Sequence, residues 1–203
     1  MNRLALVLVL ALAAKLPSQA TGNPMPKRTL DSLQGTLNSE TITLRLRSGS
    51  LEISFIPLDE QLIRLLAPNS YLSYHSLLTN QAVRLDSLAR YSGVREPGVA
   101  LVSFHALAPN TRFDPQLLTV NVQGQPFRAV GVLPMSGTFS NQQLDTGGST
   151  SALFVFAKAI PLNQPFTVAY QEGVSEDWDR RLTRLDNERA RILGRTRPDS
   201  AKH

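Results

Sequence analysis

Two neighbouring segments of the chain alternate between apolar and polar side chains at every second position. In Thr41–Arg47, isoleucine and leucine alternate with threonine and arginine, and Leu51–Phe55 repeats the alternation after the turn residues Ser48–Ser50. A period of two places all the apolar side chains on one face of an extended strand. The two segments therefore predict an amphipathic β-hairpin with one face in a hydrophobic core.

Five later segments also have the character of strands. They are Val99–Ala106, Leu118–Val122, Phe127–Leu133, Ala152–Ala157 and Phe166–Tyr170. The fourth of these is apolar on both faces, which is typical of a central strand covered on both sides. Seven short strands separated by Gly, Pro and Asn turns indicate a mainly β (α+β) fold, and we expect an Ig-like antiparallel β-sandwich over residues 41–173.

Between residues 58 and 92 the apolar period changes to that of a helix. Leu58–Leu66 carries its acidic residues early, where they complement the positive end of the helix dipole, and Pro68 ends this segment. Apolar residues then recur at helical spacing, at Leu78, Ala82, Leu85 and Ala89. Gly93 stands where a helix C-cap glycine belongs. We predict a two-helix insertion at about 58–92.

From Ser175 the composition shifts to that of a charged helix. Ser175 can cap this helix, and Glu176 and Asp177 favour its first turn. An apolar stripe follows at Trp178, Leu182, Leu185 and Ile192. We predict an amphipathic C-terminal helix at 174–194 and a disordered tail at 195–203.

Arginine residues occupy the other faces of this predicted helix. The candidates for contact with an anionic surface, such as a lipid or a polymer, are Arg180, Arg184, Arg191 and Arg195. Acidic residues are interleaved, and Glu188 is placed for an (i, i+4) pair with Arg184. A solvated helix docked by its narrow apolar stripe, or self-association, explains the same pattern.

The first 20 residues have the pattern of a secretory signal peptide. Arg3 precedes an apolar run of 11 residues at Leu4–Ala14, and Pro17–Ala20 offers small residues at the positions that a signal peptidase reads. A membrane anchor needs about 20 apolar residues, more than this run contains. We expect cleavage after Ala20, a flexible tether at 21–40, and an exported protein, periplasmic or secreted, with no transmembrane segment after cleavage.

Composition narrows the class of protein. A chain of 203 residues with 42% hydrophobic content suits one globular domain. Without cysteine it has no disulfide scaffold, cysteine nucleophile, Cys-ligated zinc or iron–sulfur cluster. Removal of the first 20 residues takes away Arg3 and Lys15 and leaves 19 basic against 16 acidic residues, which gives no argument for binding nucleic acid. We expect no cofactor and no metal.

The segment Asp145–Gly147 reads Asp-Thr-Gly and precedes an apolar strand. It resembles the active-site signature of pepsin-like and retroviral-type aspartic proteases. The resemblance implies a hydrolase in which Asp145 is half of a carboxylate pair that shares one proton. Since the chain holds a single such segment, the second carboxylate would come from a second copy of the chain. Asn141–Gln143 precede Asp145, where that family has an apolar strand.

The same residue types are those that turns select, because glycine adopts positive φ and Asp and Ser bond to nearby backbone. We therefore expect a turn with Asp145 exposed and no catalytic residue. The internal histidines, His75 and His105, lie in a predicted helix and at a strand end, and we expect structural or surface roles for both.

Three functional hypotheses follow. The first is a non-catalytic binding or assembly module with a partner in the cell envelope. The second is a peripheral binder of anionic surfaces through the arginine-rich helix, and the third is a dimeric aspartic-protease-like hydrolase that uses Asp145.

Overall fold

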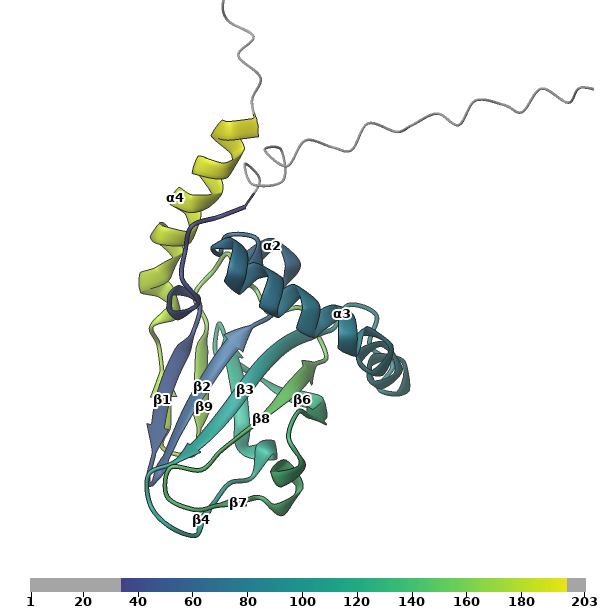
Figure 1. The fold of residues 1–203 in the computed structure, drawn as a ribbon, viewed down its shortest axis with the longest axis vertical. Coiled ribbons are helices and arrows are strands. Elements are labelled where there is room, and N and C mark those ends of the chain that lie inside the picture. Colours follow the sequence, from purple (N-terminus) through teal and green to yellow (C-terminus); the bar gives the residue numbers. More distant parts are fainter. Residues whose placement is uncertain (1–33, 197–203) are drawn as a thin grey trace, which may run out of the picture.

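The computed structural model describes residues 34–196, so the predicted signal peptide, most of the predicted tether and most of the predicted tail lie outside the described residues. Its main sheet has eight antiparallel strands in the order β1-β2-β3-β8-β6-β5-β9-β10. These strands are β1 (Leu44–Ser48), β2 (Leu51–Pro57), β3 (Gly98–Ala106), β5 (Leu118–Val122), β6 (Gln125–Pro134), β8 (Ser149–Phe156), β9 (Thr167–Tyr170) and β10 (Gly173–Ser175). A small second sheet pairs β4 (Thr111–Arg112) with β7 (Gln143–Leu144), as Figure 1 shows. Three short 3-10 helices lie in the connections, η1 (Ser39–Thr41), η2 (Pro115–Leu117) and η3 (Gly137–Asn141).

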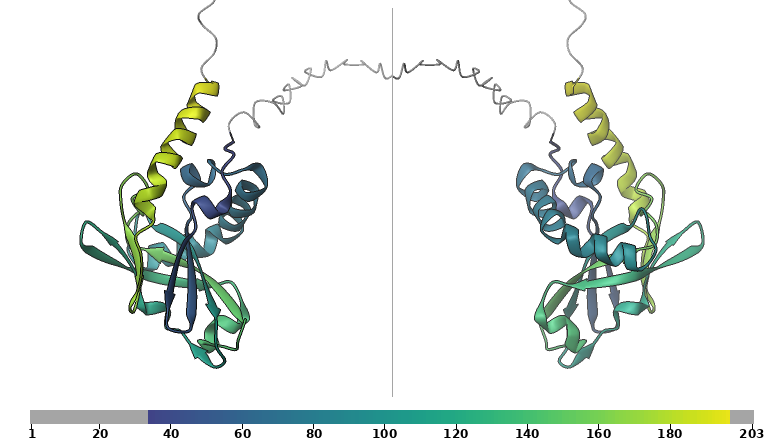
Figure 2. Two further views of the ribbon diagram at one scale, coloured as in Figure 1. Left: turned by 90° about the vertical axis from the view of Figure 1, so that its left-hand side faces the viewer. Right: turned by 90° about the vertical axis from the view of Figure 1, so that its right-hand side faces the viewer.

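The main sheet curls until it is nearly barrel-shaped (Figures 1 and 2). Strand β6 joins its two halves, because its first residues pair with β5 and its last residues pair with β8. An irregularity between Ala129 and Gly131 interrupts the register, and a bulge of this kind lets a strand bend. The mainly β prediction is confirmed. The Ig-like sandwich is not confirmed, since the strands form one continuous sheet.

The two edge strands of this sheet, β1 and β10, lie against each other. A Cβ atom on Gly173 would stand 2.4 Å from the carbonyl oxygen of Arg47, so the close approach requires glycine. Next to it, the Ser48 hydroxyl donates a hydrogen bond to Oε1 of Gln171 at 3.0 Å. The approach shields both edges from pairing with other chains.

Side chains that face inward from the curled sheet form the core. Phe55, Phe104 and Phe154 have no exposed surface. The Phe104 ring on β3 stacks on Phe113 with centroids 4.6 Å apart and meets Tyr170 on β9 at 5.8 Å. Strands from both halves of the sheet therefore share one core, and that sharing holds the sheet in its curled form.

The predicted helical insertion is present as α2 (Glu60–Ile63) and α3 (Pro68–Tyr91). Asp59 caps α2, because its carboxylate accepts hydrogen bonds from the backbone N–H groups of the second and third residues that follow. Gly93 ends α3 with φ +69°, and the N–H groups of Gly93 and Val94 donate to the carbonyls of Arg90 and Ala89. This is a Schellman motif, as the position of the glycine predicted.

Helix α3 crosses the outer face of the sheet over β6 and β8 (Figure 1). Its Leu88 side chain packs where Gly131 of β6 lacks a side chain. Leu153 and Val155 point outward from β8 beneath this cover and are fully buried. The expectation of a central strand covered on both sides is therefore confirmed for β8.

The C-terminal helix, α4 (Trp178–Thr196), rises from the end of β10 (Figure 2). It begins later than the sequence predicted, because Ser175 belongs to β10 and does not cap the helix. Trp178 and Leu185 are fully buried, with Trp178 against the Phe166 ring at 4.8 Å, and Leu182 and Ile192 pack beside them. The predicted apolar stripe is thus the docking face of α4. No helix within residues 34–196 is long and apolar enough to cross a bilayer.

Residues 34–40, which the sequence assigned to the tether, are packed on the domain. Leu37 is buried and pairs with Leu66 in an isolated parallel bridge. The N–H of Gly35 donates to the Arg64 carbonyl at 2.8 Å. A Cβ atom on Gly35 would overlap the backbone of Leu65, so glycine is required for this contact. The described chain therefore joins the fold before the first predicted strand.

Candidate functional site

A pocket of about 200 Å³ lies where β5, β6 and the end of β8 meet the loop that follows β8. We call it the mouth pocket, because its walls include inward-facing residues at one end of the curled sheet. Nine residues line it: Val120, Val122, Phe127, Phe156, Lys158, Ala159, Ile160, Pro161 and Gln164. Three wider depressions of about 370 to 480 Å³, two of which share lining residues with the mouth pocket, are more open to solvent.

The fold builds this pocket from strand alternation and one fixed loop. Val120 and Val122 are on the inward face of β5, and Phe156 is the last inward residue of β8. The loop after β8 is held to the sheet because the N–H of Gly98 donates to the carbonyl of Lys158 at 3.0 Å. Prolines at 161 and 165 restrict the loop further. The loop wall of the pocket is therefore tied to β3 at Lys158.

Two polar side chains stand among the apolar walls. The Lys158 ammonium lies 5.7 Å from the centre of the Phe127 ring, within the range of a cation–π contact. Gln164 accepts a hydrogen bond at Oε1 from Nε2 of Gln123 at 3.2 Å, which leaves its own amide N–H groups to donate elsewhere. No acidic side chain is among the nine lining residues.

These properties suit the binding of a small apolar group. An apolar cavity of about 150 Å³ in another protein holds benzene, so the mouth pocket has room for a ring and a few further atoms. Burial of the ring would follow from the hydrophobic effect at about 25 cal/mol per Å². Serine, histidine, aspartate and glutamate are all missing from the lining, so the pocket has walls for binding but no acid–base pair.

The structure places Asp145 in a tight turn between β7 and β8. The N–H of Gly148 donates to the Asp145 carbonyl at 2.8 Å, and Gly147 has φ +75°, the conformation that a type II turn requires at its third position. The Asp145 side chain is exposed, as the turn interpretation predicted. Within residues 34–196 no hydrogen bond or ion pair involves its carboxylate. The apolar strand after it is β8.

The four candidate arginines share one side of α4, since positions 180, 184, 191 and 195 are spaced by whole helical turns. Two of them are paired: Arg180 with Asp177 at 3.3 Å, and Arg191 with Glu188. Arg184 and Arg195 have exposed side chains and no ion pair within the described residues. We call these four residues the arginine stripe. They form one surface of α4, although ion pairs with Asp177 and Glu188 neutralise two of the four charges.

Glu188 has a different partner from the one the helix spacing suggested. Its carboxylate is buried and accepts hydrogen bonds from Nε of Arg191 at 2.7 Å and from the N–H of Thr36 at 2.6 Å. The Arg191 guanidinium, aided by Thr36, outweighs the opposing effect of burial and lowers the pKa of Glu188 to about 2. The pair therefore fastens the segment at Thr36 to α4, and Arg184 has no part in it.

A row of polar residues crosses the outer face of β1, β2, β3 and β8. The register places Arg47, Glu52, His105 and Ser149 directly opposite one another on successive strands. Nδ1 of His105 lies 2.8 Å from the Ser149 hydroxyl, a contact that sequence spacing did not reveal. A serine hydrolase also needs free backbone donors for an oxyanion. The nearby N–H groups of Gly147 and Gly148 already donate to carbonyls, so neither is free to bind an oxyanion next to Ser149.

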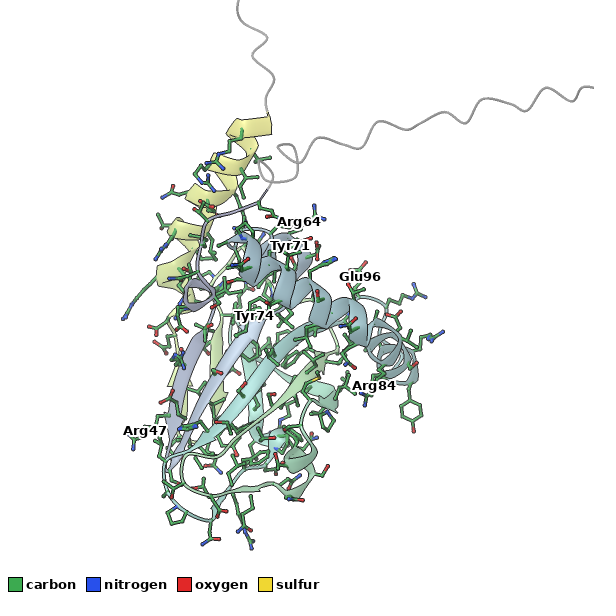
Figure 3. All side chains as sticks on the ribbon, viewed as in Figure 1. Arg47, Arg64, Tyr71, Tyr74, Arg84 and Glu96 are labelled. Carbon is green, nitrogen blue, oxygen red and sulfur yellow. The ribbon has the colours of Figure 1, made fainter. Side chains whose placement is uncertain are left out.

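A second histidine, His75 on α3, belongs to a polar cluster around Glu60. The Glu60 carboxylate accepts hydrogen bonds from Arg64 at 3.0 Å and from the Tyr71 hydroxyl at 3.0 Å, and it lies 3.1 Å from His75 Nδ1. Figure 3 shows Arg64 and Tyr71 together where α2 meets α3. Although partial burial opposes ionisation, these bonds hold the pKa of Glu60 below its usual value. The cluster joins the two helices, as the structural role expected of His75 implies.

The part of the chain from 34 to 196 contains no group of three or more His, Asp or Glu side chains that could hold a metal ion. Sequence reasoning did not find the mouth pocket, because its lining comes from β5, from β6 and from the end of β8 with the loop that follows it. The proline-containing loop at 157–165 between two strands was the one local signal. No protein-family model, no curated protein and no solved structure matches this chain.

Proposed function

We propose that this chain is an exported, non-catalytic binding module and that the mouth pocket holds a small apolar group of its ligand. The observation that carries the proposal is the pocket itself: a partly enclosed space of about 200 Å³ with apolar walls and two polar groups. Small-molecule sites in proteins typically have this composition, and the mouths of curled sheets are a common place for them.

The proposed export rests on the N-terminal sequence, with its basic residue, apolar run and small residues before position 21. A partner in the cell envelope follows from that location. The group that enters the pocket belongs either to a free small molecule or to a side chain of such a partner.

The first experiment measures binding of a neutral probe, 3-phenylpropanol, to the mature protein by NMR titration. A ligand of this size in an apolar pocket is expected to have a dissociation constant of about 1 mM or below. In Val122→Phe the larger side chain fills the pocket, so binding should weaken at least about tenfold. Val174→Phe is the matched control, because Val174 is exposed on β10, away from the pocket.

A second pocket variant, Ala159→Phe, guards against a folding defect, since Ala159 is exposed on the loop and lines the pocket. The melting temperature of each variant is recorded first. If the probe binds the wild type and both folded pocket variants equally, the mouth pocket is not the ligand site. If the probe does not bind the wild type at all, the proposed function is wrong.

The arginine stripe supports a second candidate function, attachment to anionic surfaces. The supporting observation is that Arg180, Arg184, Arg191 and Arg195 lie on one side of α4. Vesicles with 30 mol% phosphatidylserine should then bind the protein at low salt and release it at high salt. The double variant Arg184→Gln/Arg195→Gln should bind more weakly, whereas Arg84→Gln/Arg90→Gln on α3 should not. Equal binding of both double variants to the vesicles would show that the arginine stripe is not the contact surface.

A further inference from the structure

We infer that the ligand of the mouth pocket is an anionic amphiphile: a small carboxylate whose aromatic or short aliphatic body fills the pocket while its charge pairs with Lys158. This inference rests on the proposed function and adds to it the chemical class of the ligand. It follows from the charges on the pocket wall rather than from its volume.

The wall has one sign of charge. Lys158 is the charged residue among the nine that line the pocket, and Gln164 is the other side chain with polar atoms. Both offer hydrogen-bond donors, the ammonium of Lys158 and the amide of Gln164, whose Oε1 already accepts from Gln123. Lys158 has no ion pair with an acidic residue within residues 34–196. An incoming carboxylate therefore meets two donors and no acidic side chain among the lining residues.

The apolar part of the wall fixes the orientation of such a ligand. Burial of a carboxylate against Val120, Val122 and Phe156 would cost it hydration without any compensating hydrogen bond. The charge therefore stays at the position of the Lys158 ammonium, which lies 5.7 Å from the centre of the Phe127 ring. The apolar part of the ligand, about the size of one aromatic ring, then extends from the carboxylate into the pocket. A cationic ligand of the same shape would be repelled.

Three probes with one shape and different charge test the inference: 3-phenylpropionate, 3-phenylpropanol and 3-phenylpropylamine. At pH 7 and low salt the wild type should bind the carboxylate about two- to fivefold more tightly than the alcohol, since Lys158 is exposed, and the amine should be the weakest. In Lys158→Gln the preference should disappear, while Lys158→Arg should keep it. Salt at 0.5 M should reduce the preference in the wild type.

The outcomes separate this inference from the proposed function. Equal affinity of the wild type for all three probes, or a preference for the carboxylate that persists in Lys158→Gln, would overturn the anionic ligand and leave the pocket as a site for apolar groups. Failure of all three probes to bind would overturn the proposed function itself. Lys158 is exposed on a loop, so Lys158→Gln is expected to fold, and Arg128→Gln on β6 is a control for the loss of one positive charge.

Discussion

The ammonium of Lys158 lies over the ring of Phe127, 5.7 Å from the ring centre, and both residues line the mouth pocket. Lys158 comes from the loop after β8 and Phe127 from β6, so the contact joins two separately held parts of the rim. An exposed cation–π contact of this kind contributes about 0.5–1 kcal/mol. It also keeps the one positive charge of the wall close to the apolar surface, which is the basis of the ligand class proposed above.

Glu188→Gln should reduce stability in a way that depends on pH. In the wild type the folded-state pKa of about 2 is below the ordinary value of 4.5, so the stabilisation is fully present above pH 4.5 and is lost as pH falls from there toward 2. At pH 7 the variant should lose up to about 3 kcal/mol of unfolding free energy. Urea unfolding at several pH values measures the difference, which should narrow below pH 4.5. A difference in unfolding free energy that is constant from pH 7 to pH 2.5 would show that the Glu188 carboxylate does not stabilise the fold through its charge.

Ser175→Ala distinguishes two roles for this serine. A helix N-cap serine replaced by alanine costs about 1 kcal/mol. In the structure the Ser175 hydroxyl is buried in β10 and has no hydrogen-bond partner within the described residues. Removal of an unsatisfied buried hydroxyl should leave stability unchanged or raise it by up to about 1 kcal/mol. Chemical unfolding of the wild type and of Ser175→Ala measures the difference in unfolding free energy. A lower value in the variant would indicate that Ser175 caps the helix after all.

Gly173→Ala should separate the two edges of the main sheet. The added Cβ would stand 2.4 Å from the Arg47 carbonyl oxygen, a backbone atom that cannot move aside cheaply. We expect a loss of about 3 kcal/mol. Gly194→Ala in α4 is the matched control, because nothing lies within 4 Å of that position, and alanine should stabilise the helix by up to about 1 kcal/mol. If thermal unfolding shows the same change in stability for both variants, strands β1 and β10 do not lie in contact at Gly173.

The turn at Asp145 predicts opposite responses at two neighbouring positions. Gly147→Ala should cost about 1–2 kcal/mol, because alanine is strained at φ +75°. Asp145→Asn should change stability by less than about 0.5 kcal/mol, since the side chain is exposed. A peptide-library assay at acid pH completes the comparison: peptide cleavage by the wild type that Asp145→Asn abolishes would overturn the turn interpretation and establish the hydrolase.

The local parts of the fold were predictable from the sequence because their signals are local. The alternation in Leu44–Arg47 and Leu51–Phe55 specifies the β1–β2 hairpin, whereas Thr41, where the predicted strand begins, belongs to η1. The position of Gly93 likewise specifies the end of α3 through its positive φ. The helical spacing of Trp178, Leu182, Leu185 and Ile192 likewise predicted the apolar stripe of α4.

Contacts between distant residues were not predictable, because no short pattern encodes them. Thr36 and Glu188 are 152 positions apart, so helix spacing assigned Glu188 to Arg184. The meeting of β1 with β10 depends on the three residues Gly173–Ser175, too few for a strand signal. The mouth pocket combines residues from both halves of the sheet and a loop, so its lining emerges only from the closed topology.

Intermolecular NOEs between 3-phenylpropionate and methyl-labelled protein show directly whether the mouth pocket is the ligand site. If the ring occupies this pocket, its protons should show NOEs to the methyl groups of Val120, Val122 and Ile160, and none to the exposed methyl groups of Val83 and Val174. Bound ligand whose ring protons show NOEs only to methyl groups outside the pocket would contradict binding in the mouth pocket.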